Sequence, residues 1–101
     1  MSKSVKINGT KDKPRVSVYR SNRFISGQVI DDVAGKTLFS VSSQIVKTGK
    51  PTEKAFEAGR ILGAKITEKK IGSLVFDRNG YRYHGQVKAF ADGIRDAGVT
   101  I

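Results

Sequence analysis

The hydrophobic pattern changes its period along the chain, and this change limits the folds that the chain can adopt. Within residues 14–42, apolar side chains alternate with polar ones, as in Val16-Ser17-Val18-Tyr19. An alternation of period two is typical of β-strands that bury one face. Three such runs, starting near Pro14, Phe24 and Thr37, are separated by short turn signals. We therefore expect a meander of three antiparallel strands.

After residue 50 the period lengthens to that of a helix. Ala55, Gly59, Leu62 and Ile66 recur at i, i+4, i+7 and i+11, which puts them on one face of a helix. Gly59 lowers the intrinsic helix propensity, as does Gly63 one turn later. Small residues on a helix face allow close approach, so we expect this helix to lie close to the sheet.

A short apolar run and a second helical pattern complete the expected fold. Residues 74–76 (Leu-Val-Phe) predict a strand buried on both faces. A second helix is expected from about Tyr83, with Gly98 at its C-terminal cap. The element order is then β-β-β-α-β-α. Because a strand reached through a helix lies parallel to its neighbour, we predict an α/β fold of the α+β mixed-sheet type. It combines the antiparallel meander, one parallel strand and two helices packed on the sheet.

The charge of the chain is unevenly distributed. The 101 residues include 19 Lys and Arg against 9 Asp and Glu, a net charge of +10. Residues 1–23 contribute +6 of this charge and the remaining 78 residues contribute +4. We expect residues 1–13 to form a flexible basic arm and residues 14–101 to form a single globular domain. Such a basic domain favours a polyanion as its partner.

Several function classes lack the residues that they need. The chain has no Cys, which excludes disulfides and thiolate metal sites. No apolar run approaches the roughly 20 residues that span a bilayer, and residues 1–15 lack the core of a secretory signal. We therefore expect a soluble, cytosolic protein without a membrane partner. His84 is the only imidazole and has no accompanying nucleophile, so we predict no enzymatic activity, no cofactor and no small-molecule substrate.

A metal-dependent nuclease of related topology is the one enzymatic alternative. Its candidate carboxylates are Asp31, Asp32 and Asp77. In the simpler interpretation, the first two belong to a hairpin turn with Gly35, and the third caps the loop before the second helix. A fourth acidic residue at suitable spacing is missing, which weakens the nuclease hypothesis.

Three clusters of basic residues, two of them with aromatic neighbours, are candidates for RNA binding. The first, residues 78–85, lies between a strand and a helix N-terminus, where backbone N–H groups suit phosphate. The second lies at the tip of the first hairpin, and the weakest is the loop group Lys47, Lys50 and Lys54. Arg can fork onto phosphate, and Tyr can stack on an unpaired base. The predicted RNA contacts are Arg78, Asn79, Gly80, Tyr81, Arg82, Tyr83, His84 and Gly85 in the first cluster, and Arg15, Tyr19, Arg20, Ser21, Asn22, Arg23 and Phe24 in the second.

Each cluster also has a purely structural interpretation. The 78–85 segment could be a connector whose two glycines serve backbone geometry and whose Tyr rings close the core. The hairpin tip and the lysine loop could be solvated surface only.

Three blocks of the sequence resemble the family of bacterial large-subunit ribosomal protein eighteen, which binds 5S rRNA. They are residues 13–22 (KPRVSVYRSN), residues 28–32 (QVIDD), and residues 75–81 (VFDRNGY) continuing through 83–89 (YHGQVKA). The match extends from about Lys6 to the C-terminus. Asn79 stands where Gly is frequent in the family, and Asn tolerates positive φ.

The resemblance implies a non-enzymatic protein in the central protuberance of the large subunit. There it would hold 5S rRNA against 23S rRNA, beside neighbouring ribosomal proteins. It further implies that Lys88 and the 78–85 segment form an RNA-facing loop. The residues that the resemblance assigns to 5S rRNA contacts in the arm and hairpin are Lys6, Lys11, Lys13, Arg15, Arg20, Ser21, Asn22 and Arg23. The alternative is a basic domain that binds any structured RNA without preference.

Overall fold

The computed structural model describes residues 13–101, whose strands and helices follow one another in the predicted order. The predicted basic arm, with Lys6 and Lys11, lies outside the described residues apart from Lys13. Within residues 13–101, no helix combines the length and apolar character needed to cross a membrane. The elements are β1 (Arg15–Arg20), β2 (Ile25–Asp31), β3 (Lys36–Ser42), the 3-10 helix η1 (Ser43–Ile45), α1 (Pro51–Glu68), β4 (Val75–Asp77) and α2 (Gln86–Asp96).

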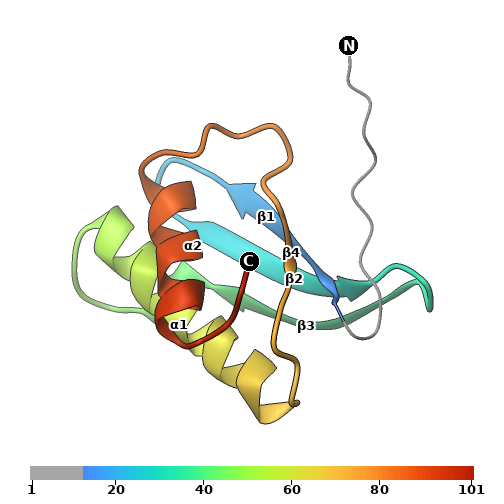
Figure 1. Ribbon diagram of the computed structural model, residues 1–101. Helices are drawn as coiled ribbons and strands as arrows, with labels where there is room; N and C mark the ends of the chain where they lie inside the picture. Colours follow the sequence, from blue (N-terminus) through green and yellow to red (C-terminus); the bar gives the residue numbers. More distant parts are fainter. Residues whose placement is uncertain (1–12) are drawn as a thin grey trace.

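The four strands form one mixed sheet in the order β3-β2-β1-β4 (Figure 1). β1 pairs with β2, and β2 with β3, in antiparallel fashion, whereas β4 lies parallel to β1. This arrangement confirms the predicted meander with one added parallel strand. The pairing also brings the end of β1, the start of β2, and the ends of β3 and β4 to the same end of the sheet.

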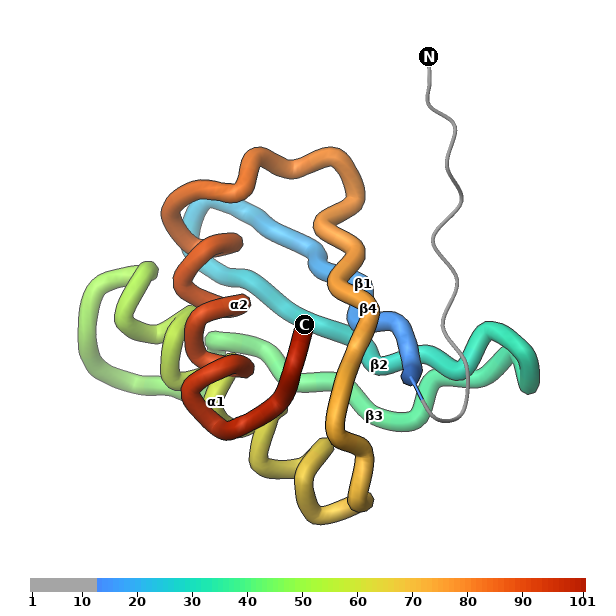
Figure 2. The backbone as a smooth tube through the Cα atoms, in the orientation of Figure 1, coloured from blue at the N-terminus to red at the C-terminus, as the bar shows by residue number. Residues whose placement is uncertain are grey.

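Both helices pack on one face of the sheet (Figures 1 and 2). Val16, Val18 and Val29 point into this layer, where they join Leu62 of α1 and Phe90 of α2 in one fully buried core. Cross-strand partners face the same side of a sheet, so the residues that alternate with these valines lie on the opposite face. No described helix covers that face.

The two helices cross at glycines that bring their backbones into contact. A Cβ added at Gly59 would overlap the carbonyl oxygen of Phe90, and a Cβ at Gly93 would overlap that of Phe56. At Gly63 the nearest atom would be the Cβ of Ala97, at 2.6 Å. The expectation that Gly59 and Gly63 face the sheet was therefore wrong. They face α2, because the larger side chains of the same helix occupy the space over the strands.

The prediction of a strand buried on both faces at residues 74–76 was also wrong. β4 is a half-buried edge strand of three residues, paired with β1 alone. Only Leu74, just before the strand, is fully buried. Phe76 is partly covered by the ring of Tyr83, which meets it edge-on with the ring centroids 6.4 Å apart. An apolar run of this length does not distinguish a central strand from an edge strand covered by a loop.

Helix α2 starts at Gln86, three residues after the predicted start at Tyr83. Gly85 has φ 57° and ψ −125°, which is incompatible with a helix, so the helix begins after it. The predicted cap at Gly98 is confirmed, with φ 96°. The N–H of Gly98 donates to the carbonyl of Arg95, and that of Val99 to the carbonyl of Ile94, as in a Schellman motif.

Arg15 ties three segments together at the start of β1. Its guanidinium donates to both carboxylate oxygens of Asp32 at 2.9 and 3.1 Å, and to Asp77 of β4 at 3.0 Å. The hydrogen bond to Asp32 raises the pKa of Arg15 above its usual value. Forked contacts between Arg and carboxylate are strong when partly buried, and the Arg15 side chain is only 19% exposed. This cluster fixes the edge strand to the sheet.

Replacing Gly93 with Ala should destabilise the fold. The new Cβ would push α1 away from α2, and overpacking of this kind costs about 1–3 kcal/mol or more. The better helix propensity of Ala offsets about 1 kcal/mol. We expect the free energy of unfolding, measured in urea, to fall by roughly 2 kcal/mol.

The matched control for this substitution is Gly72→Ala, because a Cβ at Gly72 meets no atom within 4 Å. Its free energy of unfolding should change by less than about 0.5 kcal/mol. Equal losses for the two variants would show that the helix crossing is not tightly packed.

Replacing Arg15 with Gln should also destabilise the fold. Asp32 and Asp77 would then lose the guanidinium that bridges them, and losing hydrogen bonds to charged groups costs about 1.5–3 kcal/mol. Urea unfolding measures this loss. Arg23→Gln is the control, since Arg23 is exposed and forms no ion pair within residues 13–101. A neutral Arg15→Gln variant would contradict a structural role for the cluster.

Candidate nucleic-acid interface

The hairpin tip between β1 and β2 and the loop of residues 78–85 meet in one surface. The guanidinium of Arg20 lies 5.7 Å from the centre of the Tyr81 ring. The amide of Gln86, at the start of α2, donates to the carbonyls of Ser21 at 3.2 Å and Asn22 at 3.3 Å. Two clusters that are about 60 residues apart in the sequence therefore form a continuous candidate interface.

Asn79 fixes the 78–85 loop to β1 beyond the end of β4. Its side-chain amide donates to the hydroxyl of Ser17 and to the carbonyl of Val18, both at 2.8 Å. Its own N–H donates to Asp77 at 2.9 Å, and its φ is 52°. The expected tolerance of Asn79 for positive φ is confirmed. Gly80 has φ 81°, so backbone geometry is also part of what the loop glycines contribute.

The 78–85 loop presents cations around a shallow hollow. Arg78, Arg82, Tyr83 and His84 line a hollow of about 410 Å³. Arg78 donates to the carbonyl of Tyr81 at 2.6 Å, which holds its guanidinium over the loop. Arg82 and His84 are exposed and form no side-chain hydrogen bond within the described part of the chain. Exposed guanidinium groups around a hollow suit a phosphate group.

The tyrosines of this loop also have structural contacts. Tyr81 packs against the hydrophobic core. The hydroxyl of Tyr83 accepts a hydrogen bond from Arg95 at 2.5 Å, and the Arg95 guanidinium lies 5.9 Å from the centre of that ring. This hydrogen bond raises the pKa of Arg95. No pattern in the sequence points to Arg95, because its partner Tyr83 lies 12 residues away on a loop of irregular backbone.

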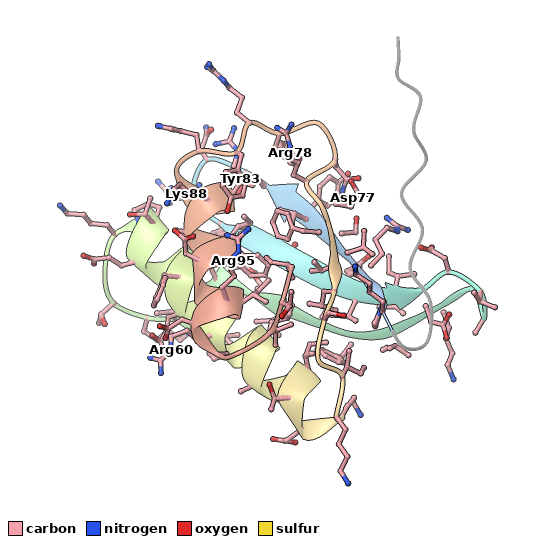
Figure 3. All side chains as sticks on the ribbon, in the orientation of Figure 1. Arg60, Asp77, Arg78, Tyr83, Lys88 and Arg95 are labelled. Carbon is pink, nitrogen blue, oxygen red and sulfur yellow. The ribbon has the colours of Figure 1, made fainter. Side chains whose placement is uncertain are left out.

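Lys88 lies on the first turns of α2, next to the loop (Figure 3). Its ammonium donates to Asp92 at 2.8 Å, and this hydrogen bond raises the pKa of Lys88. Exposed pairs of this kind are weak, so the ammonium can exchange Asp92 for a phosphate. Arg60, also labelled in Figure 3, lies away from the loop, in the helical layer.

The lysine loop starts at the same end of the sheet as the hairpin tip. Lys47 and Lys50 are exposed on the segment that joins η1 to α1. The N–H of Lys50 donates to Glu53 at 2.9 Å, which caps the start of α1. η1 itself is tied to the start of β2, where the N–H of Ile25 donates to Ser43 at 3.0 Å.

The uncovered face of the sheet carries small polar side chains that our sequence analysis did not select. Gln28 pairs across the sheet with Ser17 on one side and with Ser40 on the other, and Ser26 lies between Tyr19 and Ser42. The period-two pattern already indicated this face, since these are the polar residues that alternate with the buried valines along the strands. This face adjoins the hairpin tip and extends the candidate interface.

The net charge of the chain comes from residues outside the two helices. The two helices carry Glu53, Glu57, Glu68, Asp92 and Asp96 against Lys54, Arg60, Lys65, Lys88 and Arg95, five of each sign. Within the whole chain of 19 basic and 9 acidic residues, the segments outside the helices then hold 14 and 4. Their difference equals the full net charge of +10. A polyanion is therefore attracted more strongly to the segments outside the helices than to the helices as a whole.

The carboxylates of the nuclease alternative have structural roles. Asp31 accepts from the N–H groups of Val33 and Ala34 in the β2–β3 turn, which confirms the simpler interpretation. Asp32 and Asp77 converge on the guanidinium of Arg15. Among the described residues, no group of three His, Cys, Asp or Glu side chains could hold a metal ion.

The sequence-predicted residues therefore divide into three groups. The hairpin tip, the 78–85 loop, Lys88 and the lysine loop all lie toward one end of the sheet. Arg15 lies at the other end of β1, where Asp32 and Asp77 occupy its donors. Lys6 and Lys11 lie outside the described residues.

Comparisons with known proteins show the family of the chain. Residues 3–101 match the family model described as ribosomal L18 of archaea, bacteria, mitochondria and chloroplast. The chain is 47% identical over 97 residues to the large ribosomal subunit protein uL18 of Brachyspira hyodysenteriae, covering 94% of this chain and 82% of that protein. It is 50% identical over 96 residues to the uL18 of Lactiplantibacillus plantarum, covering 93% of this chain and 81% of that protein. These relatives are structural ribosomal proteins, which confirms the prediction of a non-enzymatic function. The chain belongs to the uL18 family of large-subunit ribosomal proteins.

Proposed function

We propose that this chain binds 5S rRNA and helps to attach it to 23S rRNA in the central protuberance of the large subunit. The contact between the hairpin tip and the 78–85 loop supports this proposal best, because it gathers Arg20, Arg78 and Arg82 at one end of the sheet. The protein would remain bound to ribosomes in the cytoplasm, where neighbouring ribosomal proteins surround it.

The proposed action is electrostatic and geometric. Packed RNA segments repel one another through their phosphates, and a basic surface between them offsets this repulsion. Arg side chains fork onto phosphate oxygens, which fixes orientation, whereas Lys side chains contribute point charges. In this scheme the arm lysines and the lysine loop add attraction, and the two joined clusters set the orientation. Arg15 contributes indirectly, by fixing β4 and hence the start of the 78–85 loop.

The neutral helical layer has a complementary role in this proposal. Six of its ten charged side chains form ion pairs within the layer, as between Arg60 and Asp96 at 3.1 Å. A surface with equal numbers of positive and negative charges attracts a polyanion only weakly. The protein would therefore approach the RNA with its sheet, its loops and the first turn of α2 that carries Lys88, and leave the rest of the helical layer for solvent or for neighbouring proteins.

The affinity for 5S rRNA should fall steeply with salt concentration. If about six phosphates are contacted, the slope of log affinity against log salt concentration should lie near −4 to −5. Binding to a labelled 5S rRNA over a salt series, in competition with a tRNA, measures both the slope and the preference. Equal affinity for the two RNAs would support the general RNA-binding alternative, and a flat salt dependence would contradict the electrostatic model.

Removing a cation from the 78–85 loop should weaken RNA binding without affecting the fold. We expect Arg82→Ala to lower the affinity for 5S rRNA about tenfold, since hydrogen bonds to charged groups contribute about 1.5–3 kcal/mol. The salt slope should become shallower by about one. Arg78→Ala should act similarly. Gel-shift titration gives the affinity, and circular dichroism checks the fold.

Arg60→Ala is the matched control, because it removes the same charge from the helical layer. The Arg60 side chain is 51% exposed in its ion pair with Asp96, so its loss has little effect on stability. Its affinity should stay within about twofold of the unmodified protein. An equal loss of affinity for Arg60→Ala and Arg82→Ala would mean that only total charge matters.

A further inference from the structure

Tyr19 is the most exposed aromatic side chain among the described residues. It is 73% exposed on the uncovered face of the sheet. Its cross-strand partner is Ser26, which in turn pairs with Ser42 on β3. A large ring beside two small side chains leaves the sheet surface hollowed next to the ring, instead of covered by a neighbouring apolar side chain.

That hollow has a volume of about 370 Å³, which exceeds the volume of a single nucleobase. Its lining combines the apolar surfaces of Tyr19 and Phe24 with the polar groups of Ser26, Ser42 and Gln44. Within residues 13–101, the side chains of Tyr19, Ser26 and Gln44 form no hydrogen bond with one another or with other residues. Their donors and acceptors are therefore available to the edge of a ligand.

A second hollow lies beside the same ring. It has a volume of about 300 Å³ and is lined by Ser17, Tyr19, Ser26, Gln28 and Asn79. Tyr19 and Ser26 thus line both hollows, and polar side chains make up most of the remaining lining of the second one. An isolated exposed aromatic residue is common on protein surfaces, but a ring that lines two hollows offers its surface to a flat ligand.

A cationic residue contributes to the first hollow. Arg20 is part of its lining, and its guanidinium lies 5.7 Å from the centre of the Tyr81 ring in the loop that follows β4. A nucleotide carries a flat base and a phosphate on the same sugar. A ring that can stack, followed in the chain by an Arg residue, matches this chemistry.

We propose that Tyr19 is a stacking platform for an unpaired RNA base, which enters the hollow between Tyr19 and Phe24. Gln44 and the two serines contact the edge of the base, and Arg20 contacts the adjoining phosphate. This inference rests on the proposed RNA-binding function, which it extends from phosphate attraction to the capture of an extruded nucleotide.

Fluorescence at this position tests the inference directly. The chain contains no Trp, so Tyr19→Trp places a unique fluorophore on the platform. A stacked base should quench most of its emission when 5S rRNA is added. Val33→Trp is the control, since Val33 is 79% exposed in the β2–β3 turn at the opposite end of the sheet, and its emission should change little. Equal quenching at both positions, or none in the Tyr19→Trp variant, would overturn the proposal.

Affinity measurements separate stacking from charge. We expect Tyr19→Leu to bind 5S rRNA about tenfold more weakly, with an unchanged salt slope, because a stacking contact is lost and no charge is removed. Tyr19→Phe, which keeps the ring, should bind within about twofold of the unmodified protein. Full affinity in Tyr19→Leu would overturn the stacking role.

The two proposals fail in different ways. Salt-dependent binding of 5S rRNA without quenching at position 19 would refute the platform and leave the proposed function intact. If a gel shift shows no binding of 5S rRNA to the unmodified protein, both proposals fall together.

Discussion

The backbone contact between α1 and α2 at Gly59 and Gly93 is the constraint on which the rest of the architecture depends. Glycines at the crossing let the two helices pack closely side by side, with α1 over β2 and β3 and α2 over β1 and β2. Both helices then share one face, where Phe90 and Leu62 fill the core. The opposite face is left to polar side chains, and this free face is what makes a broad RNA contact possible.

Element order and side-chain alternation were predictable from the sequence because both follow from local periodicity. The Asp31 turn and the Gly98 cap were predictable for the same reason, since each depends on hydrogen bonds within a few residues. The contacts that shape the candidate site are not local. Asn79 reaches Ser17, 62 residues away in the sequence, and Gln86 reaches Ser21, 65 residues away. No spacing rule within one sequence predicts such pairs. The hairpin tip and the 78–85 loop could therefore be identified as separate clusters, but their contact could not be predicted.

The errors have the same physical origin. The three apolar residues at 74–76 matched a central strand, because the sequence does not show which neighbours a strand will have. Phe76 is covered by Tyr83 from a loop, a contact that depends on where the loop folds back. Likewise, Gly59 and Gly63 indicated a close approach but not its partner. Periodicity identifies the face of an element that is buried, whereas tertiary structure decides what buries it.

Arg15 and Arg20 show why basic residues alone do not define an interface. They lie at the two ends of the same six-residue strand. Arg15 faces Asp32 and Asp77 and is only 19% exposed on its side chain. Arg20 faces Tyr81, whose ring orients the guanidinium but does not neutralise it. The difference arises from where the fold puts its few acidic residues. At the start of β1, Asp32 and Asp77 bind the Arg15 guanidinium and so hold the sheet together. Within the described residues, no acidic side chain forms an ion pair with Arg20 at the end of β1, so its guanidinium can bind a phosphate.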